Sequence, residues 1–141
     1  MPPAALIASS PDASLFETSY DRSTSAPREA RDDIVRVLKN WNLVQGAGDL
    51  LVIVTELVTN ALTHTDSRLV TVSLIRLGAR SLILFVADSS PVLPDPPSMP
   101  SVRAETGRGL AIVATLSAHL AHVRCRSGKR AVVVYEVPLD E

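Results

Sequence analysis

The fold is most clearly marked by "GDLLVIVTELVTNALTHT", residues 48–65, an apolar run that carries a carboxylate, Glu56, and a carboxamide, Asn60, near its end. Its length favours a largely buried helix from Asp49 to about His64 over a strand, although Val, Ile and Thr are weak helix formers. Glu56 and Asn60 lie four residues apart, so in a helix they project from the same side. The pattern fits a pair of functional groups, and it also fits a helix that only exposes a polar face. The apolar residues at helical spacing are Leu50, Val54, Leu57 and Ala61.

Two elements precede this helix. "SLFETSY", residues 14–20, predicts a short strand. "SAPREARDDIVRVLKNW", residues 25–41, has Ser25 and Pro27 where helices begin. Its apolar residues then recur at helical intervals up to Trp41. We therefore expect a surface helix that buries one side.

Two hairpins and a third helix follow. "RLVTVSLIR" (68–76) and "SLILFVAD" (81–88) predict an antiparallel hairpin whose second strand is apolar on both faces and therefore central. "GRGLAIVATLSAHL" (107–120) predicts a helix, and "AHVRCR" (121–126) with "RAVVVYEVP" (130–138) predicts a closing hairpin. The order of elements indicates an α+β fold, a two-layer sandwich of a mixed, mainly antiparallel sheet and about three helices.

A proline-rich segment separates the two hairpins. Five of the ten prolines lie within residues 89–100, which excludes a helix or an inner strand there. We expect a long loop from Asp88 to about Thr106. Loops of this length in compact domains are usually functional or disordered.

Length and composition limit the classes of function. The 141 residues suit a single domain, which we place at residues 14–141 after a disordered N-terminal tail, residues 1–13. With 14 Lys and Arg against 15 Asp and Glu, no general cationic surface is available for nucleic acid. The single Cys125 alternates with arginines and is interpreted as a small core residue. No signal peptide or membrane span is recognisable, so we expect a soluble, cytoplasmic protein without membrane contact.

Two more polar positions stand out. Asp88 ends the central strand, where a carboxylate often caps the following turn. "TGRGL", residues 106–110, places glycines where a helix begins, and the amides and dipole of a helix start suit an anion. A flexible helix start has the same sequence pattern.

In order and spacing, these positions resemble the ATP-binding fold of gyrase, bacterial histidine kinases and mismatch-repair ATPases. Within that superfamily the chain is most similar to the small anti-sigma-factor serine/threonine kinases. "ELVTNALTH" (56–64) resembles their N box, "VADSSP" (86–91) their first glycine box and "GRGLAIV" (107–113) their second. The resemblance extends from the strand near Phe16 to the last hairpin.

The resemblance implies ATP and Mg²⁺ as cofactors. It assigns to Asn60 a neutral amide oxygen that ligates Mg²⁺, and to Glu56 the orientation and deprotonation of the hydroxyl that attacks the γ-phosphate. Asp88 would accept a hydrogen bond from the adenine amino group and repel the carbonyl of guanine.

The same resemblance assigns the phosphates to the second glycine box. Gly107 and Gly109 would let backbone amides approach them, Leu110 completes the motif, and Arg108 would either contact the γ-phosphate or face solvent. The loop 89–106 would act as a lid over the nucleotide.

One residue departs from the family pattern. Ser90 stands where the first glycine box usually has Gly. If that position needed a positive φ, Ser would cost about 1 kcal/mol.

For function, the resemblance implies an ATP/Mg²⁺-dependent serine/threonine protein kinase that acts as an anti-sigma-factor-type regulator in partner switching. The expected partner is a sigma factor or an anti-sigma-factor antagonist, and a homodimer is expected. The alternative is a nucleotide-binding module that sequesters a partner without phosphoryl transfer.

Overall fold

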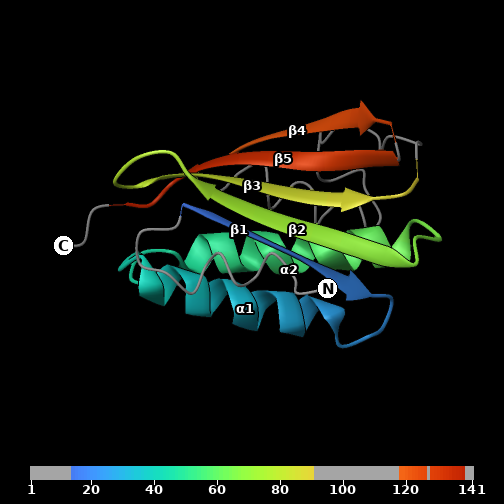
Figure 1. Ribbon diagram of the computed structural model, residues 1–141, viewed down its shortest axis with the longest axis horizontal. Helices are drawn as coiled ribbons and strands as arrows, with labels where there is room; N and C mark the ends of the chain where they lie inside the picture. The colour runs from blue at the N-terminus through green and yellow to red at the C-terminus, as the bar shows by residue number, and fades with distance from the viewer. Residues whose placement is uncertain (1–13, 91–117, 127, 139–141) are drawn as a thin grey trace, which may run out of the picture.

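The computed structural model describes residues 14–90, 118–126 and 128–138, which form one sheet and two helices packed on one of its faces (Figure 1). The elements in chain order are β1 (Leu15–Asp21), α1 (Ala26–Asn40), α2 (Gly48–Thr63), β2 (Leu69–Arg76), β3 (Ser81–Asp88), β4 (Ala118–Cys125) and β5 (Gly128–Glu136). The predicted α+β sandwich is confirmed, with both described helices in one layer.

The sheet has five strands in the order β1-β2-β3-β5-β4, and its four pairings are antiparallel. β3 is therefore central, as its apolar sequence predicts. Its inner residues Leu82, Leu84 and Val86 are buried, whereas Ile83 and Phe85 on the outer face are half-buried.

The helices bury the stripes that their sequences predict. In α1, Ala30, Ile34 and Leu38 are fully buried, and Pro27 lies in the first turn, where its missing N–H does no harm. The buried residues of α2 are Leu50, Ile53, Val54, Leu57, Val58 and Ala61. Together with the inner sheet face they form the main core. No helix in the described ranges is long and apolar enough to cross a membrane.

The start of β4 corrects the expected third helix. Ala118–Leu120 were predicted to end a helix, but Ala118 pairs with Tyr135 and Leu120 with Val133. These residues form a strand because they can hydrogen-bond with the backbone of β5. In this strand Leu120 also packs against the core. The rest of the predicted helix, 107–117, lies outside the described residues, as does the tail 1–13.

Cys125 does not belong to the buried core of the described residues. It lies on β4, as predicted, and it is half-buried near the end of that strand. Alternation with arginines identifies a strand correctly, but it does not say whether another layer covers the apolar face.

Candidate functional site

Glu56 and Asn60 lie one turn apart on the side of α2 that does not pack into the core. Both are partly exposed, and their neighbours on this side, Val52 and Thr59, are exposed. The buried residues of α2 do not include either of them. The two polar residues therefore contribute little to packing, and they border a surface that a ligand can reach.

The side-chain amide of Asn60 has an unsatisfied nitrogen. Its Nδ2 is buried and has no hydrogen-bond partner among the described residues. A buried polar group without a partner costs about 1–3 kcal/mol. A half-turn of the amide exchanges its nitrogen and its oxygen, so the side chain can offer either atom to a ligand. Asn60 is therefore a candidate for contact with a ligand.

Asp88 lies at the end of β3 with its side chain only 5% exposed. Its Oδ1 accepts a hydrogen bond from the Ser90 backbone amide at 2.8 Å and one from Lys129 Nζ at 3.0 Å. The expected turn cap is therefore present. The partner Lys129 is not recognisable from the local sequence, because it faces Asp88 only through the register of β3 and β5.

Ser90 does not have the positive φ that would have made it less favourable than glycine. Among the described residues, Asn42 is the non-glycine residue with a positive φ, at 59°. Ser90 therefore does not need the conformation that favours glycine. Its amide is held by Asp88 instead, which is an ordinary way to stabilise a turn after a strand.

Gly128 holds the start of β5 close to this turn. Its φ is +152°, and a Cβ at this position would lie 2.1 Å from the carbonyl oxygen of Asp88. No other residue type fits without displacing the backbone. This contact fixes Lys129, the next residue, opposite Asp88.

Hydrogen bonds connect the helix of the site to its strand. Thr65 Oγ1 donates to the Ala61 carbonyl at 2.5 Å, and the Ser67 amide donates to Thr65 Oγ1 at 3.1 Å. Ser67 Oγ in turn accepts from the Ser89 amide at 2.5 Å. The segment after α2 therefore joins the helix that carries Asn60 to the end of β3.

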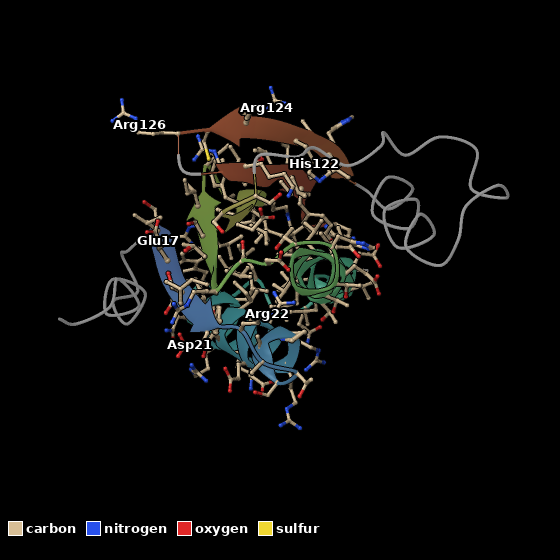
Figure 2. The ribbon with its side chains drawn as sticks, turned by 90° about the vertical axis from the view of Figure 1, so that its right-hand side faces the viewer. Glu17, Asp21, Arg22, His122, Arg124 and Arg126 are labelled. Carbon is tan, nitrogen blue, oxygen red and sulfur yellow. The ribbon has the colours of Figure 1, made fainter. Side chains whose placement is uncertain are left out.

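Arg22 secures the C-terminal end of α2. Its guanidinium donates to the carbonyls of Leu62 at 2.7 Å, Thr65 at 3.0 Å and Ser67 at 3.1 Å. Figure 2 shows Arg22 between the end of β1 and the helices. A cation at a helix C-terminus also interacts favourably with the helix dipole. Arg22 is therefore the cation at this end of α2, while the exposed His64 donates its backbone amide to the Asn60 carbonyl.

His122 lies near the ion pair. It pairs with Ala131 across β4 and β5, on the inner side of the sheet (Figure 2). Burial lowers the pKa of His122, the charge of Lys129 lowers it further, and Asp88 partly opposes the shift. The polar end of the inner sheet face, defined as Asp88, Lys129 and His122, is therefore electrostatically coupled.

A cavity of about 610 Å³ opens beside the C-terminal half of α2. It lies between α2 and the connection from β1 to α1, and Thr59 and Thr63 place it next to Glu56 on the helix surface. Its lining residues are Arg22, Ser23, Thr24, Pro27, Thr59, Leu62 and Thr63.

The described residues fit a metal ion that is bound together with a nucleotide. None of them form a group of three or more His, Cys, Asp or Glu that would hold a metal alone. Mg²⁺ on a nucleotide is held mainly by phosphate oxygens and water, with one or two protein oxygens. A single amide oxygen from Asn60 fits that role.

The structure places part of the predicted site. It brings together Glu56 and Asn60 on α2 and, through Ser67 and Ser89, joins this helix to Asp88. The residues predicted to bind phosphate, Gly107, Arg108, Gly109 and Leu110, and most of the predicted lid lie outside the described ranges.

Comparison with known proteins identifies the family. The sequence profile of the histidine kinase-like ATPase domain matches residues 22–135. The chain therefore belongs to the histidine kinase-like ATPase family. No curated protein matches the chain.

Two solved structures are similar to this chain. One is the histidine kinase domain of the Erythrobacter litoralis EL346 blue-light activated histidine kinase, at 26% identity and a TM-score of 0.47, covering 67% of this chain and 46% of that one. The other is the Erythrobacter litoralis EL346 blue-light activated histidine kinase, at 26% identity and a TM-score of 0.48, covering 67% of this chain and 31% of that one. The chain thus matches less than half the length of either structure.

Proposed function

We propose that this protein is an ATP- and Mg²⁺-dependent serine/threonine protein kinase that acts as an anti-sigma-factor-type regulator in partner switching. The observation that carries the proposal is the position of Glu56, one turn before Asn60 on the accessible side of α2. A domain that only held nucleotide would have no chemical need for a carboxylate beside the metal ligand.

Each residue has a defined role in this proposal. Asn60 binds the metal, and Mg²⁺ neutralises part of the charge of the phosphates when it is bound. Glu56 orients the hydroxyl of the acceptor and takes its proton as the oxygen attacks the γ-phosphate. Asp88 receives the purine base at the end of β3.

The cavity beside α2 supports a protein acceptor. Hydroxyl and apolar side chains line it together with Arg22, and it lies next to Glu56 along the helix. A segment of a partner seated there would bring a serine or threonine towards the carboxylate. We expect the partner to be a sigma factor or an anti-sigma-factor antagonist in the cytoplasm, and the protein to act as a homodimer.

The existing hydrogen bonds of Asp88 favour a second candidate function. Its Oδ1 already accepts bonds from Lys129 and Ser90, so a nucleotide base meets a carboxylate that has partners. Weak nucleotide binding would suit a module that sequesters its partner without phosphoryl transfer. The two functions differ in whether phosphate moves.

Phosphate transfer to a co-purified partner tests the proposal. The wild type should move the γ-phosphate of labelled ATP onto a serine or threonine of that partner. Glu56→Gln should bind ATP as the wild type does and transfer at least about a hundredfold more slowly, the usual scale of a general base. Asp66→Asn, an exposed carboxylate in the segment after α2, is the matched control and should transfer normally.

Two results would decide against it. A Glu56→Gln protein with wild-type transfer would remove Glu56 as the base. A wild type that binds ATP but phosphorylates no co-purified partner would favour the sequestering module.

A further inference from the structure

Lys129 is an unusual residue for the inner face of a sheet. It is only 7% exposed, although lysine is almost never buried unless it is paired. Its partner is Asp88, with Nζ 3.0 Å from Oδ1, and the two side chains are 9% and 5% exposed. Any group that reaches the Asp88 carboxylate therefore meets a cationic donor beside it.

The pair is also held in place. The Ser90 amide binds the same Oδ1, and the contact of Gly128 with the Asp88 backbone fixes the register of Lys129. The donor and the acceptor are thus arranged before any ligand arrives. Such preorganisation favours ligands whose hydrogen-bonding edge matches the pair.

Stability alone does not explain a buried ion pair at this position. Buried ion pairs are often no more stabilising than apolar residues of similar volume. The rest of the inner row on β5, Ala131, Val133 and Tyr135, is apolar or aromatic. A charged residue at this one position, opposite the residue proposed to receive the base, indicates a role in recognition.

We propose that Lys129 broadens the base specificity of the site, so that it binds guanine nucleotides as well as adenine nucleotides. This inference rests on the proposed function. A lone carboxylate accepts a hydrogen bond from the 6-amino group of adenine and repels the 6-oxo group of guanine. With Lys129 beside it, the ammonium donates to the 6-oxo group while Asp88 accepts from the N1–H of guanine.

The same two side chains can bind adenine, with the ring positions that they contact exchanged. Asp88 accepts from its 6-amino group, and Lys129 donates to N1. The pair therefore offers each purine one acceptor and one donor, and the discrimination expected from a carboxylate alone is lost.

Calorimetric titration of the full chain with ATP and with GTP, both with Mg²⁺, tests the inference. The wild type should bind both nucleotides with dissociation constants within about tenfold of each other. Lys129→Met should lose at least about tenfold more affinity for GTP than for ATP, because a bidentate match to a base typically discriminates on this scale. Lys129→Arg keeps a donor and should retain GTP binding.

Arg130→Met is the matched control. Arg130 is the next basic residue on β5, but it stacks on Phe85 on the outer face, with its guanidinium carbon 4.9 Å from the ring centre. Removing this charge should leave the ratio of the two affinities unchanged. If Lys129→Met does not fold, as judged by circular dichroism, the double variant Asp88→Asn/Lys129→Met removes both charges and should bind GTP more weakly than the wild type.

The outcomes separate the two claims. A wild type that binds ATP about a hundredfold more tightly than GTP would overturn the inference and leave the proposed function standing. An equal change in the affinity ratio for Arg130→Met would also overturn it. A wild type that binds neither nucleotide would overturn the proposed function together with the inference.

Discussion

Ser67 and Ser89 connect the helix of the site to its strand: their Oγ atoms lie 2.9 Å apart, and the Ser89 amide donates to Ser67 Oγ at 2.5 Å. Ser67 is only 1% exposed. Asn60 precedes this contact and Asp88 adjoins it. The contact therefore helps to set the spacing between the two ends of the candidate site.

Replacing Ser67 with Ala should lower the free energy of unfolding by about 1–3 kcal/mol, because the Ser89 amide loses its acceptor in a partly buried place. Urea unfolding measures the change. Ser19→Ala is the control, since it breaks a similar hydroxyl pair with Thr71, at 2.8 Å, in an exposed position. That change should stay within about 0.5 kcal/mol. Equal losses for both variants would contradict the importance of the Ser67 contact.

Replacing Gly128 with Ala should destabilise the fold by about 1–3 kcal/mol, because the new Cβ would overlap the backbone of Asp88. ATP affinity should fall as well, since Asp88 must shift. Thermal unfolding and nucleotide titration measure the two effects. Gly78→Ala is the control, because a Cβ there meets no atom within 4 Å. A stable Gly128→Ala protein with unchanged ATP affinity would show that the close approach does not position Asp88.

The fold should lose stability as the pH falls through about 6.5, in part because of His122. Burial and the charge of Lys129 lower the pKa of His122 from 6.5 in the folded protein, so the unfolded chain takes up this proton first. The stabilising contribution is present above pH 6.5 and is lost below it. Urea unfolding of the wild type and of His122→Gln at about pH 7.5 and pH 5.5 should show a smaller difference for the variant.

His119→Gln gives the comparison for this measurement. His119 lies on the same strand and is exposed. Its replacement should leave the pH dependence as in the wild type. If His122→Gln and the wild type lose the same stability between the two pH values, His122 is not the group responsible.

Much of the fold follows from local patterns. The two hairpins and the central position of β3 were predictable because alternation and apolarity on both faces are properties of single segments. The helix α2 was predictable from its length, despite its β-branched residues. Glu56 and Asn60 were predictable as a pair because helical spacing alone places them together.

The rest depended on contacts between distant segments. Ala118 and Leu120 favour a helix locally, and the strand state of this segment comes from pairing with β5. The ion pair of Lys129 and Asp88 joins residues 41 positions apart, and it requires the strand register to be known. The contact of Ser67 with Ser89 likewise depends on where α2 ends relative to β3. The sequence marks such residues only as ordinary polar positions in turns or strands.

Binding of a nucleotide-bound metal by Asn60 is tested by the Mg²⁺ dependence of ATP affinity, measured by calorimetry for the wild type and for Asn60→Ala. Thr59→Ala, on the exposed side of the same helix, is the control. Mg²⁺ should strengthen ATP binding to the wild type and to Thr59→Ala. Asn60→Ala should lose this gain and keep most of the metal-free affinity, because only the metal ligand is removed. The same Mg²⁺ dependence in Asn60→Ala and the wild type would exclude Asn60 as the metal ligand, and no ATP binding by the wild type would contradict the proposed function.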